Sequence, residues 1–172
     1  MANAIATERL RKRFAKWDAD GSGSLERSDF VQEAAEIAQA FGKSVTSSEA
    51  RALTEAFTSM FEQVAKGAGS LSEEQFVAAA GPLVEAGAET KFDQVLRPVV
   101  KGVVGLCDQN HDGQINGEEF ATWLIAVGVD ESKTSTLFEQ VDKDGNGELS
   151  VDELLNVVRD FHYGKSDVEL LG

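Results

Sequence analysis

Three twelve-residue segments of the chain repeat one arrangement of oxygen-bearing side chains, and this repeat constrains the fold more than any other feature. The segments are DADGSGSLERSD at 18–29, DQNHDGQINGEE at 108–119 and DKDGNGELSVDE at 142–153. Each has an oxygen-bearing side chain at positions 1, 3, 5, 9 and 12, a glycine at position 6 and an aliphatic residue at position 8. Three gapless matches in one chain make an accidental acidic turn a poor explanation.

The spacing suits a hard divalent cation. Calcium takes roughly six to eight oxygen ligands at about 2.3–2.6 Å. Side chains at positions 1, 3 and 5 converge on one point if the chain curls around it, and glycine at position 6 tolerates the positive φ that the curl needs. Position 7 offers its carbonyl oxygen, and position 12 adds a carboxylate from the following helix. The sequence therefore predicts three calcium-binding loops of the EF-hand type.

The candidate ligands follow from these positions. In the segment at 18–29 they are Asp18, Asp20, Ser22, the Ser24 carbonyl, Glu26 and Asp29. In the segment at 108–119 they are Asp108, Asn110, Asp112, the Gln114 carbonyl and Glu119, with Asn116 acting through water. In the segment at 142–153 they are Asp142, Asp144, Asn146, the Glu148 carbonyl and Glu153, with Ser150 at position 9.

The first site differs from the other two at position 12. Asp29 is one methylene shorter than Glu119 and Glu153, so a bidentate grip on the larger calcium ion is harder. Magnesium prefers six oxygens at about 2.0–2.1 Å. We therefore expect three Ca²⁺ sites, of which the first has a weakened preference for calcium and also accepts Mg²⁺.

One more copy of the pattern lies second in chain order, at 64–75 (VAKGAGSLSEEQ). It keeps the glycine and the leucine but has no acidic ligand. Positions 1, 3, 5 and 12 are Val64, Lys66, Ala68 and Gln75, so we expect this loop to bind no calcium. In chain order the four segments are called the first to fourth loops. The second loop is expected to be structural and to pair with the first.

Helix signals agree with this organisation. Position 9 falls where a helix N-cap belongs and position 12 at N3, and Ser150 with Glu153 matches a capping box. Apolar residues such as Leu10, Phe14 and Trp17 recur at helical spacing before the loops. We predict an all-α fold of four EF-hand helix-loop-helix units in two pairs, packed into one compact globule. A short antiparallel β link should join Leu25 to Leu71 and Ile115 to Leu149 at position 8.

The division between the pairs is predicted near residue 80, with an N-terminal pair at 1–80 and a C-terminal pair at 81–172. Gly81-Pro82, Gly87 and Arg97-Pro98 lie between them and are expected to break helices. A long uninterrupted central helix is therefore not expected, and the two halves should fold against each other. The apolar tail residues Val168, Leu170 and Leu171 are candidates to cover any remaining cleft.

Composition excludes several function classes. The formal net charge of −14 opposes binding to nucleic acid, which requires Lys and Arg to neutralise phosphates. No apolar run approaches the length of a membrane span, and no membrane association is expected. The single Cys107 excludes an intrachain disulfide, and the N-terminus lacks a signal peptide's apolar core. These features predict a cytoplasmic, monomeric protein that is not an enzyme.

Several segments resemble the sarcoplasmic calcium-binding protein family. They are RLRKRFAKWD, RPVVKGVVGLCDQNHDGQIN and, in the tail from Gly145 to Gly172, GNGELS, DELL, RDFH and DVELLG. The similarity runs from Ala4 to Gly172. The resemblance implies a compact cytosolic protein with active first, third and fourth loops and an inactive second. It also implies a calcium buffer or transport role.

The sequence is also compatible with a calcium sensor, a photoprotein or a lipid-binding helix. A calcium sensor exposes a Met-rich groove, but Met60 is the only internal methionine, which favours a buffer. A calcium-regulated photoprotein holds a luciferin among His, Trp and Tyr. Here His111 lies inside a metal loop, which leaves His162-Tyr163 near the end of the chain, and Trp17 and Trp123 are interpreted as ordinary core or surface residues. The basic stretch from Arg9 to Lys16 could bind anionic lipid, although a solvated helix face is the simpler interpretation.

Overall fold

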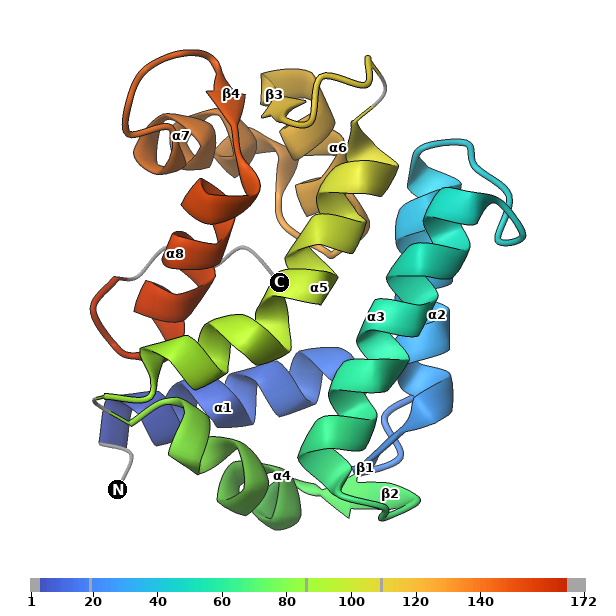
Figure 1. Cartoon of the computed structure of the whole chain (residues 1–172), viewed down its shortest axis with the longest axis vertical. Coiled ribbons are helices and arrows are strands. Elements are labelled where there is room, and N and C mark those ends of the chain that lie inside the picture. The colour runs from blue at the N-terminus through green and yellow to red at the C-terminus, as the bar shows by residue number, and fades with distance from the viewer. Residues whose placement is uncertain (1–3, 19, 86, 109, 167–172) are drawn as a thin grey trace.

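Helices and short loops alternate along the chain, as the repeat predicts (Figure 1). The computed structural model describes residues 4–18, 20–85, 87–108 and 110–166; the predicted cover residues Val168, Leu170 and Leu171 lie outside these ranges. The helices are α1 (Ala4–Trp17), α2 (Arg27–Ala40), α3 (Ser48–Ala65), α4 (Glu73–Ala80), α5 (Glu89–Cys107), α6 (Gly117–Ala126), α7 (Glu131–Val141) and α8 (Val151–His162), with a 3₁₀ turn η1 (Gly81–Leu83). The strands are β1 (Ser24–Glu26), β2 (Ser70–Ser72), β3 (Ile115–Asn116) and β4 (Glu148–Leu149).

Each loop leads into its following helix through the predicted cap. The side chains of Ser72, Asn116 and Ser150 accept hydrogen bonds of 3.2, 3.0 and 3.2 Å from the N–H three residues on. The side chain at that third residue accepts a return bond from the cap's own N–H, which completes a capping box. These bonds satisfy helix donors that would otherwise lack partners, so each helix starts at a fixed residue.

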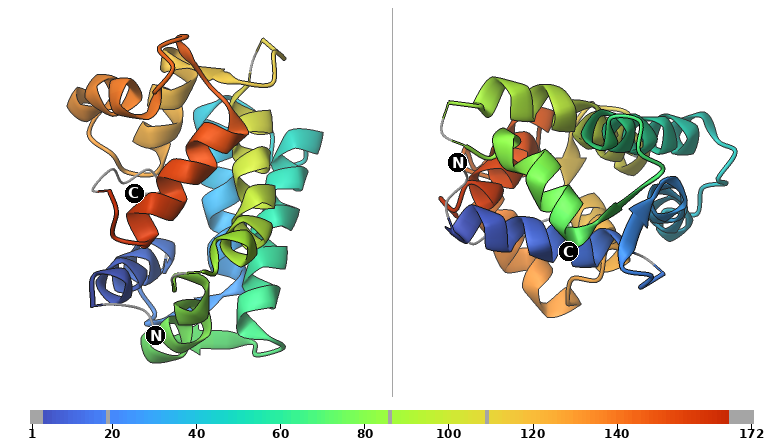
Figure 2. Two further views of the ribbon diagram at one scale, coloured as in Figure 1. Left: turned by 60° about the vertical axis from the view of Figure 1, so that its left-hand side comes forward. Right: turned by 90° about the horizontal axis from the view of Figure 1, so that it is seen from below.

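The predicted pairing of loops is confirmed. β1 and β2 are antiparallel with Leu25 opposite Leu71, and β3 and β4 are antiparallel with Ile115 opposite Leu149. All four of these aliphatic side chains are buried. The two β links lie at opposite ends of the molecule (Figures 1 and 2). The all-α fold with four helix-loop-helix units in two pairs is therefore as the sequence predicts.

One continuous apolar core joins the two pairs. In the N-terminal half, Trp17 packs its ring against those of Phe30, Phe57 and Phe76 at centroid distances of 5.3, 6.5 and 6.3 Å. α3 and α5 run side by side and connect the halves (Figures 1 and 2). Gly102 permits this approach, because a Cβ there would lie 3.1 Å from the Cα of Leu53.

The expected helix break at Arg97-Pro98 is wrong. α5 continues through Pro98 and bends in Figure 1. Pro98 removes the bond to the carbonyl of Gln94, but both residues are exposed and water can satisfy that carbonyl. The buried stripe that includes Phe92, Leu96 and Val99 holds the helix together on its other side. Gly81-Pro82 does end α4, so no long central helix forms.

The interpretation of the basic stretch as a solvated face also needs correction. Arg13 is only 2% exposed, and Arg9 donates hydrogen bonds to backbone carbonyls at the end of α8. Arg11, Lys12 and Lys16 are exposed, as expected. No helix in the described part of the chain has the length and apolar character that a membrane span requires.

Candidate metal centres

The three acidic loops close with the same hydrogen bond. The Oδ2 atoms of Asp18, Asp108 and Asp142 at position 1 accept the N–H of the glycine at position 6, at 2.8, 2.7 and 2.9 Å. Those glycines, Gly23, Gly113 and Gly147, have φ of 84°, 79° and 80°. An L side chain is strained in this region, so glycine is required there for the turn.

Positions 3 and 5 are held by matching turns. The side chains of Asp20, Asn110 and Asp144 accept the N–H two residues on at 3.0, 3.3 and 3.2 Å. Those of Ser22, Asp112 and Asn146 likewise accept the N–H of position 7, at 3.3, 2.9 and 2.9 Å.

These bonds aim the candidate ligand oxygens inward along one curved segment. They also stabilise the charged form of a ligand. The N–H of Ser22, followed by its hydroxyl, lowers the pKa of Asp20. The carboxylate of Asp20 is therefore ready to bind a cation without first losing a proton.

Carboxylate oxygens gather at the first and fourth loops. One oxygen each from Asp18, Asp20 and Asp29 lies within 4.8 Å of the others, and the same holds for Asp142, Asp144 and Glu153. In the fourth loop, Oδ1 of Asp142 is buried and has no hydrogen-bond partner among the described residues. A buried carboxylate oxygen without a donor is costly unless a cation neutralises it, so this donor set fits a hard divalent ion.

The third loop is arranged differently at position 5. The carboxyl groups of Asp112 and Glu148 come close enough to share one proton, which lowers the pKa of Asp112 and raises that of Glu148. Glu148 belongs to the fourth loop and was predicted to offer only its carbonyl oxygen. The side-chain contact between the two loops was not predicted, because nothing local in the sequence marks it. Asp108 and Glu119 are buried at 7% and 5% exposure.

Position 12 serves the helix as well as the ion. Asp29 Oδ2 and the Oε1 atoms of Glu119 and Glu153 accept the N–H of position 9 at 2.9, 2.9 and 3.1 Å. A carboxylate offers about four lone pairs, so this bond leaves capacity for a cation. Of the remaining predicted positions, Ser24 and Gln114 are half-buried and Glu26 is exposed. The carbonyl of Ser24 accepts the hydroxyl of Ser22 at 3.0 Å.

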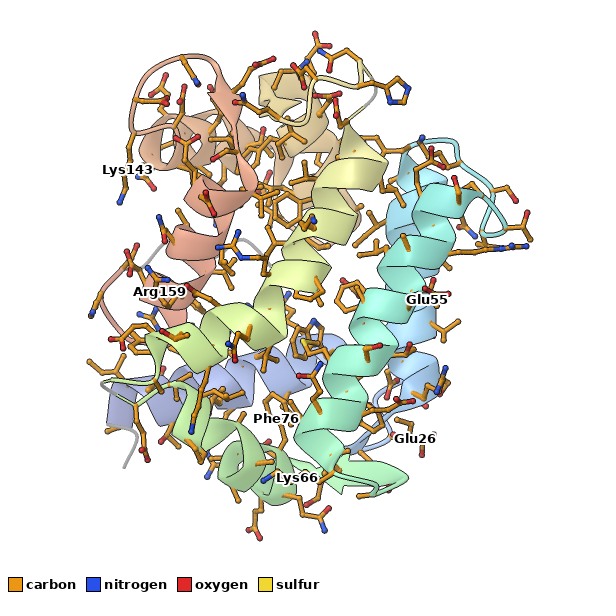
Figure 3. All side chains as sticks on the ribbon, in the orientation of Figure 1. Glu26, Glu55, Lys66, Phe76, Lys143 and Arg159 are labelled. Atoms are coloured by element: carbon orange, nitrogen blue, oxygen red, sulfur yellow. The ribbon has the colours of Figure 1, made fainter. Side chains whose placement is uncertain are left out.

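The second loop keeps the β link and the helix cap of the other loops but lacks their ligands, and its position-6 residue Gly69 does not have positive φ. α3 continues through Ala65, so Val64 lies in the helix instead of opening the loop. Lys66 follows in a left-handed conformation with φ of 51°, and Figure 3 shows it beside the β1–β2 link. Gln75 takes the place of the position-12 acid and accepts the N–H of Ser72 at 2.8 Å.

The histidines, Cys107 and Trp17, which were considered for other roles, occupy structural positions. His111 is exposed, and Cys107 is buried, which raises the pKa of its thiol. His162 and Trp17 line a largely apolar cavity of about 40 Å³. Pockets that hold drug-sized organic ligands measure roughly 300–1,000 Å³, so this cavity is too small for such a ligand.

Known proteins support the calcium assignment. The family model for an EF-hand domain pair matches residues 99–159. A solved calcium-binding protein of Streptomyces coelicolor, described in terms of prokaryotic calcium-mediated regulation, superposes with a TM-score of 0.79 at 26% identity. That match covers 92% of this chain and 98% of the other. The luciferin-binding protein of Renilla reniformis is 29% identical and covers 97% of this chain and 91% of its own.

Calerythrin of Saccharopolyspora erythraea is 53% identical over an alignment of 177 positions that covers the whole of both chains. An alignment of this length and identity spans all four loops and their helices. Together with the closed acidic loops and the paired β links, it shows that the chain belongs to the calerythrin family of EF-hand calcium-binding proteins.

Proposed function

We propose that the protein is an intracellular calcium buffer or transporter that holds three Ca²⁺ ions, at the first, third and fourth loops. The observation that carries the proposal is the common closure of these loops by a bond from the position-6 glycine to the position-1 aspartate. The ligands are sixteen residues: those at positions 1, 3, 5, 7 and 12 of the three loops, together with Glu26 at position 9 of the first. A cytoplasmic, monomeric state fits this role.

The three sites should differ in affinity. Glu119 and Glu153 can each grip calcium with two oxygens, so the third and fourth sites should reach about 10⁻⁷ M or tighter. Asp29 is shorter, and its Oδ2 already accepts the N–H of Glu26. The first site should therefore bind calcium more weakly and also accept magnesium.

The core favours a buffer over a sensor. A sensor opens its helix pairs to expose a flexible apolar groove, which in calmodulin-like proteins is rich in methionine. Here Met60 is 3% exposed and the aromatic residues around it are buried. Exposed large apolar side chains among the described residues are Ile5, Val31, Val45 and Ile125, which belong to different elements.

Calorimetric titration tests the proposal. Calcium added to chelator-treated protein should bind to about three ions per chain. With millimolar magnesium present, the weakest of the three steps should shift to higher calcium and the other two should change little. Uptake of fewer than two ions at saturation would contradict the proposal.

The second candidate is a calcium sensor. It is favoured by the similarity to the Streptomyces coelicolor protein, whose description concerns calcium-mediated regulation. The two candidates differ in a dye-binding assay with an apolar fluorescent probe. A buffer should bind less dye with calcium than without it, because calcium tightens the fold, whereas a sensor should bind more.

A further inference from the structure

Two arginines of α1 hold the end of α8. One guanidinium nitrogen of Arg9, Nη1, donates to the carbonyls of Phe161 at 2.9 Å and Ser166 at 2.7 Å. The guanidinium carbon of Arg9 also lies 4.1 Å from the centre of the Phe161 ring. A cation over an aromatic ring and two charge-assisted bonds to carbonyls make this a directional contact. The contacts of Arg9 therefore form only when the last turn of α8 and the residues after it are in place.

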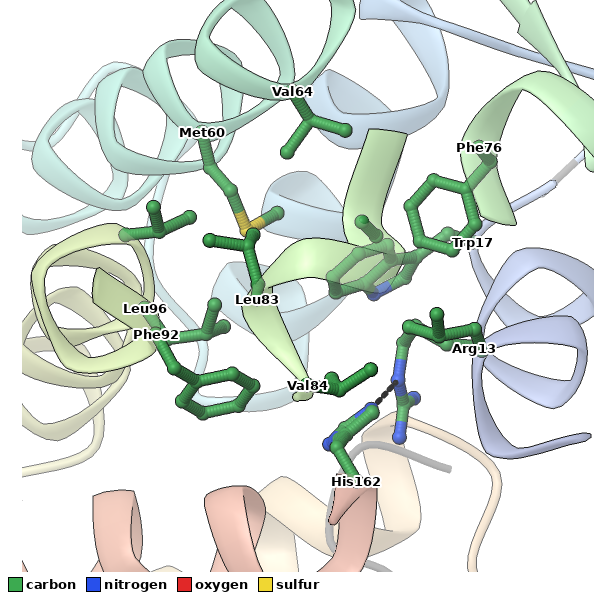
Figure 4. A pocket seen from close by; sticks show the side chains of 13 residues that line it. Arg13, Trp17, Met60, Val64, Phe76, Leu83, Val84, Phe92, Leu96 and His162 are labelled. Atoms are coloured by element: carbon green, nitrogen blue, oxygen red, sulfur yellow. Dashed lines mark hydrogen bonds between the residues drawn. The ribbon is translucent and has the colours of Figure 1, made fainter. Parts of the chain in front are cut away.

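Arg13 makes a second, buried contact one turn further along α1. Its Nε donates to Nε2 of His162 at 3.3 Å (Figure 4), and the two residues are 2% and 4% exposed. Nδ1 of His162 lies 2.8 Å from the carbonyl of Val158 and must carry the proton, since a carbonyl only accepts. Burial, followed by the charge of Arg13, lowers the pKa of His162 to about 3. The imidazole is neutral and can accept from Arg13.

The backbone of Gly164 also lies against a side chain of α1 at this point. Gly164 follows α8 with φ of 79°, and a Cβ added there would lie 2.9 Å from Cγ2 of Ile5. α1 and the end of α8 are thus fitted to each other by two arginine contacts and one close approach. The three contacts join residues about 150 positions apart and connect the two halves of the chain.

Each of these helices is attached to a metal loop. α1 ends at Trp17, directly before the position-1 ligand Asp18. α8 begins after Ser150, and its third residue is the position-12 ligand Glu153. An ion at the fourth loop binds the carboxylate of Glu153 and so fixes the direction of α8. The last turn of α8 presents the acceptors Phe161 and His162 to α1, and the segment that follows it presents the carbonyl of Ser166.

We propose that Arg9 and Arg13 are positioning residues that couple the first and fourth calcium sites, by docking the helix that enters the first loop onto the helix that leaves the fourth. The inference rests on the proposed function, because it concerns how two of its sites influence each other. An ion at either site favours the docked arrangement, and the docked arrangement favours an ion at the other. Coupling of this kind is reciprocal by thermodynamic necessity.

Arg11 provides a matched control on the same helix. It forms an ion pair with Glu73 of α4, within the N-terminal half, and both side chains are roughly half exposed. Replacing Arg11 removes the same charge from α1 without touching α8. A general effect of helix charge on the first loop would appear in Arg11→Met as well as in Arg9→Met and Arg13→Met.

The experiment measures the affinity of the first site with the fourth site intact or disabled. Trp123→Phe leaves Trp17, next to Asp18, as the sole tryptophan reporter. In this parent, Glu153→Gln should weaken calcium binding at the first site about fivefold or more, the lower range of typical couplings. In Arg9→Met and Arg13→Met the same step should change the affinity less than twofold. In Arg11→Met, Glu153→Gln should weaken calcium binding at the first site by the same factor as in the parent.

The outcomes separate this inference from the proposed function. If Glu153→Gln leaves the first-site affinity unchanged in the parent, or if Arg9→Met keeps the full factor, the coupling role is overturned although three ions still bind. If Trp17 reports no calcium at the first loop at all, the proposed function fails. Arg9 is only partly buried, so Arg9→Met alone decides the matter if Arg13→Met does not fold. If Arg9 and Arg13 only stabilised the fold, replacing them would lower the first-site affinity equally with and without Glu153→Gln. The ratio of these two affinities would then stay the same.

Discussion

The first and second loops pair with each other and differ in almost every residue that could touch an ion. Both have a buried leucine at position 8, and these leucines face each other across the β1–β2 link. Both enter the next helix through a return bond from position 12 to the N–H of position 9. Only the first loop has carboxylates at positions 1, 3 and 12.

The comparison shows that two sets of residues in an EF-hand can be separated. One set, at positions 8, 9 and 12, shapes the backbone and pairs the loops in both cases. The other set, at positions 1, 3, 5 and 12, supplies oxygen ligands for the ion, and in the active loops its position-1 carboxylate also accepts the N–H that closes the turn. Position 12 belongs to both, and Gln75 shows how a neutral side chain can perform the first task without the second.

The largest expected effect comes from making an active loop resemble the second loop at position 12. Glu153→Gln should keep the bond to the N–H of Ser150, as Gln75 does for Ser72, but removes a charged, bidentate ligand. We expect calcium affinity at the fourth site to fall roughly a hundredfold or more, about 3 kcal/mol. Calorimetry measures this, and Glu119→Gln should act in the same way at the third site.

The control for this change is the fold without calcium. Because glutamine can complete the capping box, the helical circular dichroism of the calcium-free variant should equal that of the calcium-free wild type. A loss of helix in the variant would mean that position 12 acts mainly on the backbone. The separation of the two residue sets would then be wrong.

The second prediction asks whether the ligand-free loop supports its partner. Leu71→Ala removes a buried side chain that faces Leu25 across the β link. Large-to-small changes of this kind cost about 2–5 kcal/mol, and this two-stranded edge should lie near 2 kcal/mol. Denaturant unfolding with calcium present measures the loss. Calcium affinity should fall at the first site and not at the third, which belongs to the Ile115–Leu149 link. The fourth site should change only through its coupling to the first.

The third prediction sharpens the difference between the first site and the other two. Asp29→Glu lengthens the position-12 side chain by one methylene and should restore two-oxygen contact with calcium. We expect calcium affinity at the first site to rise about tenfold, or 1.4 kcal/mol, with no gain for magnesium. Competition titrations at fixed magnesium measure the ratio. An equal gain for both ions would show that side-chain length does not set the preference.

The repeat within twelve residues explains why much of the fold was predictable. Loop closure, helix caps and the register of Leu25 with Leu71 depend on residue types at fixed local positions, so the sequence indicates them directly. The break expected at Pro98 was wrong for a local reason too. Its lost hydrogen bond faces solvent, while the buried side of α5 is continuous.

Contacts between distant segments were not predictable in this way. Arg13 appears in the sequence as one of several charges on a basic helix, and only the packing of α1 against α8 buries it beside His162, 149 positions away. The contact between Asp112 and Glu148 likewise depends on how two loops meet across the β3–β4 link. Such contacts need the tertiary arrangement, because neither partner alone carries a pattern that points to the other.

The smallest expected effect comes from the second loop's own cap. Gln75→Ala removes the acceptor for the N–H of Ser72 and leaves that donor to water, since Ser72 and Gln75 lie near the surface. Lost caps cost about 0.5–2 kcal/mol, and this site should lie near 1 kcal/mol because the serine half of the box remains. Thermal unfolding measures the change, with Glu74→Ala as the control at the neighbouring exposed position. Calcium stoichiometry should stay at three, because Gln75 caps a helix and is not a ligand. The loss of one ion would show that Gln75 supports the first site as well.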